Sequence, residues 1–469
     1  MSFTGRRHGW LGLVLCLALI GCAPPTVVRA ATSALSEPPP TTPYPRLSAL
    51  ETVSATCEAP RADQMQPVTV SKARIGLRGD QDFDPADLTD AARCWYEELW
   101  RVIHDPNQQR LVMNMVLSDD LYLYSRTVNT HISALLFAFR VTGDLDILDE
   151  VDRLAQNMRS LLKDSWRGAN GLGSGGTDGY LNWVWRQSSD TSLRGRDTHV
   201  TDEMRTHSLV AAFAYAFEAN RELTSPNGVD YAERADFWTD YLVNDFEAKW
   251  RERERVPWPR FPFLSRPHVH ETVSFIRYHH YLYLLTGQDA YRREALRLTE
   301  VVLGNFRGVE TPSGVALVTP RSILSLGGSE DYLIPTTYAR YVYSDAIDLY
   351  LEGVGAWSEE RVVSGLVLAL TEFVIDDGSD SFSRDIGGGE ARGGIRAAAE
   401  RQWERMTRER FVSSSFALFS AWDKGTTLAA VSAGAYARIP TRDRPAYVPA
   451  GLLAFEILRA SETIRGASR

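Results

Sequence analysis

Three short polar clusters, each ending in histidine, precede apolar helical stretches of this sequence. They are NTH at 129–131, RTH at 205–207 and HVH at 268–270. Imidazole, guanidinium and amide side chains can bind an anion or transfer a proton, and imidazoles can also ligate a metal ion. If the three helices are parallel neighbours, the clusters meet at one end of the fold, and the sequence predicts a shared site there.

A metal site is one interpretation of these histidines, and the spacing argues against it. The sequence contains neither HxxxH nor HExxH, and the three clusters belong to separate helices. His268 and His270 are two residues apart, so on a helix they point in different directions. We therefore expect neither a metal ion nor another cofactor.

Hydrolysis of a glycosidic bond would instead need two carboxylates that flank the bond. The candidates are Asp178, Asp202, Glu203, Glu271, Glu330 and Asp331. None of them stands in a distinctive motif. A glycoside hydrolase with paired carboxylates remains an alternative.

The residue types at the helix starts fit β-elimination on a uronic-acid polysaccharide. That reaction removes a proton next to a carboxylate, so the carboxylate must be neutralised, and His or Tyr can transfer the proton. Candidate proton-transfer residues are His207, His270, Tyr338 and Tyr332, and candidate substrate-binding residues are Asn129, His131, Arg205, Glu203 and Arg277. Glu203 lies one turn before His207 and could orient its ring. His279 and His280 are expected to be core residues.

Helices must position these side chains. From about residue 84, nearly apolar segments such as 130–142 and 270–286 alternate with amphipathic segments such as 145–164 and 289–305. A helix that is apolar all round is buried, whereas a helix with one apolar stripe lies outside. We predict an all-α fold, an α/α toroid of six to seven helical hairpins, whose parallel inner helices gather their amino termini at one end, where anions are favoured.

Two long insertions, 164–200 and 307–335, interrupt the helical pattern, and loops of this length are often functional. The first contains Trp183 and Trp185 after a glycine-rich stretch. Their flat rings could stack on a sugar of the substrate, and packing inside the fold is the other interpretation.

The amino-terminal segment has the features of an export signal, because arginines precede an apolar run over 10–20 that is too short for a permanent membrane span. The run ends in LIGC, which resembles the lipobox of bacterial lipoproteins. That resemblance implies that Cys22 is the lipid anchor. With Ala23 following, it also implies an outer-membrane lipoprotein of a Gram-negative bacterium, on the periplasmic or cell-surface face. An ordinary signal peptide with an incidental cysteine is the alternative.

The chain accordingly divides into a signal peptide at 1–22, a Pro/Thr/Ser-rich tether at 23–65 and a catalytic domain at 66–469. Of four cysteines, two fall in the signal peptide, and we expect the other two, Cys57 and Cys94, to form a disulfide. A chain of 469 residues that is 44% hydrophobic can bury a large core. Its net charge of -9 argues against a nucleic-acid partner.

The helical layout over about residues 84–462 resembles the toroid-fold polysaccharide lyases, most closely the alginate and glucuronan lyases of family 38. NTH at 129–131 is similar to the Asn–His pairing on an inner helix of alginate lyases, with Thr130 between the two residues here. The resemblance implies a metal-independent lyase that acts on an anionic polysaccharide.

The resemblance also implies that one His and one Tyr transfer the protons. His207 and His270 compete for the first role, and Tyr338, Tyr332 and Tyr278 for the second. The alternative from another class is a non-catalytic lipoprotein that captures glycans at the outer membrane, which would keep the aromatic residues and need no imidazole.

Overall fold

The structure is a computed structural model in which one compact unit, 41–469, contains every residue described below. The described residues are 57, 75–166, 177–186, 199–254, 268–326, 333–375, 415–423, 427–440 and 443–467. The predicted signal peptide with Cys22, all of the tether except Cys57, and the candidates Tyr332, Glu330 and Asp331 lie outside them. None of the described helices combines the length and the apolar character needed to cross a membrane.

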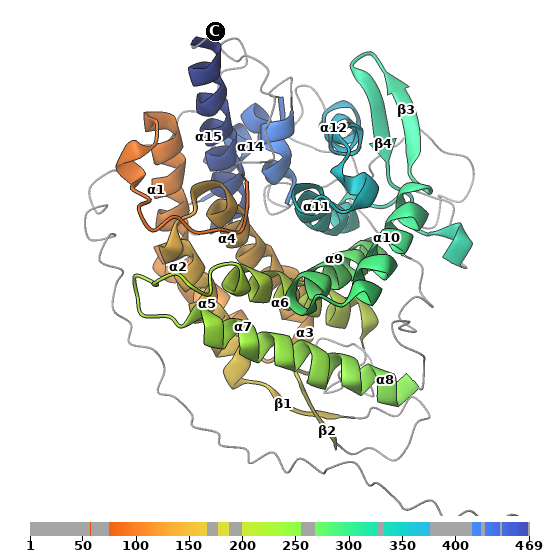
Figure 1. Cartoon of the computed structure of the whole chain (residues 1–469). Helices are drawn as coiled ribbons and strands as arrows, with labels where there is room; N and C mark the ends of the chain where they lie inside the picture. Colours follow the sequence, from red (N-terminus) through yellow and green to blue (C-terminus); the bar gives the residue numbers. More distant parts are fainter. Residues whose placement is uncertain are drawn as a thin grey trace, which may run out of the picture. The chain divides into compact units, whose positions relative to one another are not determined.

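The described part of the chain is mostly helical (Figure 1). One group of helices is buried almost all round: α4 (Asn129–Thr142), α6 (Val200–Glu218), α9 (Val269–Thr286), α11 (Thr336–Leu351), the 3-10 segment η11 (Ser415–Trp422) and α15 (Tyr447–Ala467). A second group is amphipathic or peripheral: α1 (Asp90–His104), α2 (Pro106–Val116), α5 (Leu145–Ser160), α7 (Tyr231–Asp240), α8 (Ala248–Glu254), α10 (Asp289–Leu303), α12 (Glu360–Ala369) and α14 (Thr427–Ala437).

Short helical segments join these elements. Three of them are π-helical turns that continue an α-helix or lead into one: η5 (Tyr124–Val128), η6 (Tyr241–Glu247) and η10 (Leu370–Val374). The others are η4 (Pro85–Asp87), α3 (Leu121–Leu123), η8 (Leu324–Leu326) and η9 (Gly355–Ser358).

The buried helices contact one another in an order that returns to its start. α4 packs on α6, α6 on α9, α9 on α11, α11 on η11, η11 on α15, and α15 on α4. A second helix covers several of them from outside, as α5 covers α4, α7 covers α6 and α10 covers α9 (Figure 1). The contrast expected from the sequence is clear in one pair: α9 is buried from Val269 to His279, whereas α10 buries one stripe that includes Tyr291, Ala295 and Leu298.

The helix ends follow from local sequence. Gly143 ends α4 with a φ of 73°, and Gly287 ends α9 with a φ of 67°, a left-handed conformation that favours glycine. Asp144 then starts α5 by accepting a hydrogen bond from the backbone N–H of Asp146 (3.1 Å). These tight turns join α4 to α5 and α9 to α10 at the end opposite the histidine clusters.

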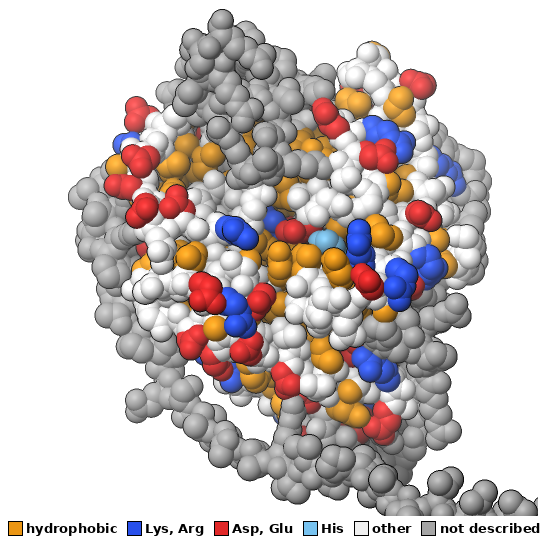
Figure 2. Space-filling model, in the orientation of Figure 1, with side chains coloured by type: hydrophobic (Ala, Val, Ile, Leu, Met, Phe, Trp, Pro, Cys, Tyr) orange, Lys and Arg blue, Asp and Glu red, His pale blue; other side chains and the backbone are white. Residues whose placement is uncertain are grey.

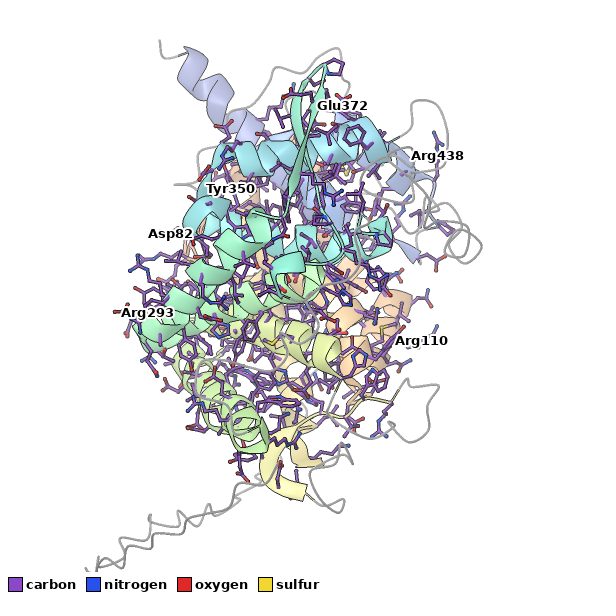
Figure 3. The ribbon with its side chains drawn as sticks, turned by 90° about the vertical axis from the view of Figure 1, so that its right-hand side faces the viewer. Asp82, Arg110, Arg293, Tyr350, Glu372 and Arg438 are labelled. Atoms are coloured by element: carbon purple, nitrogen blue, oxygen red, sulfur yellow. A yellow bond between two sulfur atoms is a disulfide. The ribbon has the colours of Figure 1, made fainter. Side chains whose placement is uncertain are left out.

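The fold is mostly helical, as predicted, and each of the two long insertions adds a small two-stranded antiparallel hairpin. β1 (Lys163–Trp166) pairs with β2 (Thr177–Asn182), and β3 (Arg307–Thr311) pairs with β4 (Gly314–Val318). The register of the second pair ends at Thr311 and Gly314, so a tight two-residue turn joins its strands. In Figure 3, Glu372 lies beside this hairpin, and Ser313 at its turn donates a hydrogen bond to Glu372 (2.6 Å).

The predicted disulfide is confirmed. Cys57 and Cys94 are bonded, with their Cα atoms 5.6 Å apart. Cys94 lies within α1, and Cys57 packs against the edge of the hydrophobic core. The bond therefore fastens a segment that precedes the first described helix to the body of the protein.

The double variant Cys57→Ser with Cys94→Ser is expected to lower the free energy of unfolding by about 3–4 kcal/mol, because the bridge closes a loop with a sequence separation of 37 residues. Urea denaturation of the oxidised wild type and the variant measures the difference. A reducing agent should move the wild type to the variant's midpoint and leave the variant unchanged. Equal midpoints for the two oxidised proteins would show that the bridge contributes no stability.

Candidate active site

Contacts at both ends of the buried helices show that α4, α9 and α11 run in the same direction. Arg126, just before α4, donates a hydrogen bond to the hydroxyl of Tyr341 near the start of α11 (3.0 Å). Arg140, near the end of α4, is 2.6 Å from Glu352 at the end of α11. Arg140 also donates a hydrogen bond to Tyr281, late in α9 (2.6 Å). The amino termini of these helices therefore share one end of the fold.

At that end, arginines gather around two tyrosines of α11. The hydroxyl of Tyr341 accepts hydrogen bonds from Arg126 (3.0 Å) and Arg340 (2.8 Å). The guanidinium carbon of Arg205 lies 3.7 Å from the centroid of the Tyr341 ring, and that of Arg321 lies 5.7 Å from the Tyr338 ring. Below, the term arginine–tyrosine cluster denotes Arg126, Arg205, Arg321, Arg340, Tyr338, Tyr341 and His270.

His270 belongs to this cluster and sits in the first turn of α9. Its ring centroid is 5.2 Å from that of Tyr338 and 6.3 Å from that of Tyr341. The side chain is buried, and its Nδ1 has no hydrogen-bond partner among the residues that the structure describes. Burial lowers the pKa of His270 well below 6.5, and the nearby positive charges of His268 and Arg205 lower it further. The imidazole is therefore neutral near pH 7 and can accept a proton.

The arginines also act on Tyr341. Burial alone would raise the pKa of its hydroxyl, but Arg340, Arg126 and Arg205 together outweigh burial and hold the pKa below its ordinary value of 10.0. The hydroxyl is thus strongly polarised, and its two hydrogen bonds restrain the guanidinium groups of Arg126 and Arg340.

The cluster carries more positive than negative charge. Among the described residues, the carboxylates paired with Arg126 and Arg205 are Asp202 at 3.6 Å and Asp345 at 3.8 Å. Within the described ranges, no carboxylate forms an ion pair with Arg340. The Nε atoms of Arg126 and Arg340 are buried without a hydrogen-bond partner among the described residues, while 24% of the Arg126 side chain remains exposed. Such a set of donors suits a carboxylate or another small anion.

The cluster is held in place by its helices. Arg126 lies on the π-helical turn η5, an irregularity that often occurs at functional sites. The side-chain amide of Asn129 donates a hydrogen bond to the backbone carbonyl of Arg205 (3.0 Å) and so ties α4 to α6. Arg321 is positioned through its own carbonyl, which accepts a hydrogen bond from the N–H of Val269 at the start of α9 (2.9 Å).

Several candidates from the sequence therefore come together: His270, Tyr338 and Arg205 lie in the cluster, and Asn129 borders it. Arg126, Arg321, Arg340 and Tyr341 were not predicted from the sequence. Helical periodicity could have found Tyr341, because it lies one turn after Tyr338 on the same helix face.

His207 lies apart from these residues. Its Nε2 is 2.8 Å from the hydroxyl of Tyr241, its Nδ1 is 2.7 Å from the carbonyl oxygen of Glu203, and its ring stacks on Phe246. Residues two positions apart on a helix point in different directions, so Arg205 faces the cluster while His207 faces η6. The proposed site therefore does not include His207.

Glu203 faces the same outer layer as His207. Its carboxylate accepts hydrogen bonds from Asn182, from Lys249 (3.3 Å) and from the indole of Trp250 (3.1 Å). The contact between Glu203 and His207 is made by the backbone carbonyl oxygen of Glu203, which lies 2.7 Å from Nδ1 of the ring.

The remaining candidates lie elsewhere. His131 is partly buried and interacts electrostatically with Glu150 and Arg153 of α5. Arg277 lies deeper along α9, paired with Asp345 (3.3 Å) and Asp348 (2.6 Å).

The two tryptophans of the first insertion differ. Trp183 is fully buried, and its indole donates a hydrogen bond to the carbonyl of Met158 (2.9 Å), so it is a packing residue. Trp185 is partly buried and stacks on His199, with ring centroids 4.3 Å apart. His199 in turn lies 3.0 Å from Asp202, which links Trp185 to the neighbourhood of Arg126. Trp185 thus stays a candidate for contact with a sugar.

The carboxylates considered for hydrolysis have separate partners. Asp178 pairs with Arg253 (2.7 Å), Asp202 accepts a hydrogen bond from Ser125 (2.5 Å), and Glu271 accepts one from Thr201. The described residues contain no group of three side chains that could hold a metal ion.

A scan against protein-family models finds no match for this sequence, and a search of curated proteins finds no significant relative.

The lowered pKa of His131 predicts how the stability of the protein depends on pH. Burial lowers its pKa from 6.5 to about 4. As the pH falls below 6.5, the unfolded chain binds a proton at this residue before the folded protein does, so stability is lost. Between pH 7 and about pH 4.5, the free energy of unfolding should therefore fall by about 2–3 kcal/mol less in the variant His131→Gln than in the wild type. Urea denaturation at the two pH values measures this, and identical pH dependence in both proteins would contradict it.

Proposed function

We propose that this protein is a polysaccharide lyase that cleaves a uronic-acid polysaccharide, of the alginate or glucuronan type, by metal-independent β-elimination. The observation that carries the proposal is the arginine–tyrosine cluster, in which neutral His270, with a buried Nδ1 that has no partner among the described residues, lies beside Tyr338 and near Arg126, Arg205 and Arg321. This set combines proton-transfer groups with surplus positive charge, and β-elimination next to a carboxylate requires both.

The roles follow from chemistry and position. Arg126 and Arg340 neutralise the uronate carboxylate, which becomes more negative as the adjacent proton leaves. His270 accepts the proton from C5. Tyr338, partly exposed, donates its proton to the leaving oxygen at C4. The C5–H and C4–O bonds break, a C4–C5 double bond forms, and no external oxidant or reductant is needed.

The α/α toroid belongs to the same proposal. The order of helix contacts that starts and ends at α4, the outer helices α5, α7 and α10, and the parallel direction of α4, α9 and α11 all support it. In a toroid the shared amino-terminal end is a natural place for an anionic ligand, because helix dipoles and free N–H groups point there.

We also propose export and lipid anchoring through Cys22, with the catalytic domain acting on polysaccharide outside the cytoplasm. The Cys57–Cys94 bond supports export, since disulfides persist mainly in oxidising compartments. Acyl-chain analysis of the purified protein by mass spectrometry tests the anchor.

The direct test of function uses the chain from residue 23 onward with alginate, polymannuronate, polyguluronate and glucuronan, and follows the ultraviolet absorbance of the unsaturated product. An increase that persists in the presence of a chelator would support the lyase and identify its polymer. New reducing ends without absorbance would favour a hydrolase. Binding without either signal would favour a glycan-capturing lipoprotein.

A further inference from the structure

A chain of alternating buried charges extends from the arginine–tyrosine cluster along the buried helices. It runs through Arg205, Asp345, Arg277, Asp348, Arg140 and Glu352, with successive nitrogen–oxygen distances of 3.8, 3.3, 2.6, 3.5 and 2.6 Å. These residues come from α4, α6, α9 and α11, and Glu352 caps the carboxyl end of α11. Acidic and basic side chains are interspersed on the face of the molecule in Figure 2. In contrast, the six charged residues of this series are almost entirely buried.

Asp345 is the only acidic member of the chain that contacts the cluster, because it alone pairs with Arg205. It is 1% exposed, and it also accepts a hydrogen bond from Ser274. The backbone carbonyl of Ser125 accepts a hydrogen bond from Arg205 Nε (3.1 Å), while Nη1 lies 3.8 Å from Asp345 and donates to the hydroxyl of Ser274 (3.5 Å). That orientation places the guanidinium carbon over the Tyr341 ring.

Stability is a weak explanation for such a chain. The free-energy cost of desolvating a buried ion pair is about as large as the gain from the attraction between its charges. Proteins in which apolar residues replace such a pair are often no less stable. A chain of buried charges is better suited to fixing the direction of a guanidinium group, since each member restrains the next.

We infer that Asp345 is a positioning residue of the active site, which holds Arg205 against Tyr341 and so fixes the geometry of the arginines that neutralise the substrate. The role in turnover rests on the function proposed above, while the effect on Arg205 does not. Asp348, one turn later on α11, belongs to the same series of ion pairs, and among the described residues its carboxylate pairs with Arg277 (2.6 Å) and Arg140 (3.5 Å) and not with Arg205. It provides a matched control.

The experiment compares Asp345→Asn with Asp348→Asn in the otherwise unchanged protein, each by crystal structure and by steady-state kinetics on the uronate polymer that the wild type cleaves. For Asp345→Asn we expect Arg205 to move away from the Tyr341 ring. We also expect kcat to fall about 10–100-fold and KM to change less than about threefold, because the variant stabilises the negative charge of the transition state less well. For Asp348→Asn we expect Arg205 to stay and kcat to change less than about threefold, although both variants lose an ion partner of Arg277 and should have lowered Tm values.

Two results would overturn the inference: Arg205 unmoved in Asp345→Asn, or equal losses of kcat in both variants at equal Tm. If the wild type cleaves no uronate polymer, the proposed function fails, and the position of Arg205 in the two crystal structures still decides the role of Asp345.

Discussion

His270→Gln is expected to lower kcat/KM on the uronate polymer by about 10²–10⁴-fold, the range that general acid–base catalysis contributes. The buried Nδ1 of His270 has no described partner, and its ring lies beside Tyr338 within the arginine–tyrosine cluster. Glutamine keeps the polarity and approximate size of the side chain but cannot accept the C5 proton. Steady-state kinetics by ultraviolet absorbance measure the loss.

His207→Gln is the matched control, because His207 is equally buried but contacts Tyr241 and Phe246 in the outer layer. We expect it to lower Tm and to leave kcat per folded molecule within about threefold of the wild type. A greater loss of kcat in His207→Gln than in His270→Gln would move the proton-transfer role to His207, the other histidine that the sequence favoured.

The pH dependence has a definite sign. Because the pKa of folded His270 lies well below 6.5, the ring stays unprotonated as the pH falls from 8 to 6.5. In this range, kcat/KM should therefore show no acid-side loss that depends on His270. Such a loss should appear only at lower pH, as the ring takes up a proton in the folded enzyme. An acid limb centred near 6.5 that His270→Gln removes would contradict this assignment.

The sequence predicted features that depend on local pattern. The apolar character of the segment that became α9, against the single stripe of α10, was enough to assign buried and outer helices. Gly143 and Gly287, which end α4 and α9, are likewise local signals for a helix end. Two remaining cysteines predicted one disulfide. In each case neighbouring residues carry the whole signal.

The composition of the cluster depends on long-range geometry and could not be predicted in the same way. Arg126 meets Tyr341 across 215 positions of sequence, and the rotation of each helix about its axis decides which side chain faces inward. The RTH cluster at 205–207 illustrates this, because Arg205 faces the arginine–tyrosine cluster and His207 does not. Periodicity establishes that a helix is buried on all sides, and it then gives no preferred face.

Arg340→Gln is expected to lower kcat/KM by about 10²–10³-fold, the usual cost of losing one electrostatic contact to the developing charge. Among the described residues Arg340 has no carboxylate partner, so its charge is available to the substrate, and its bond to Tyr341 fixes its direction (2.8 Å). The lost charge should also make the remaining activity less sensitive to salt, since attraction of an anionic polymer is screened by ions. Kinetics at low and high ionic strength measure both effects.

Arg361→Gln is the control for net charge, because Arg361 lies on α12 with 77% of its side chain exposed and pairs only with Glu359 in the described structure. Its removal changes the total charge by the same amount and should leave kcat/KM within about twofold. If Arg361→Gln and Arg340→Gln weakened turnover equally, overall charge rather than a positioned guanidinium would govern the reaction. A large loss in Arg340→Gln alone, with the salt dependence reduced, would locate the substrate carboxylate at the arginine–tyrosine cluster.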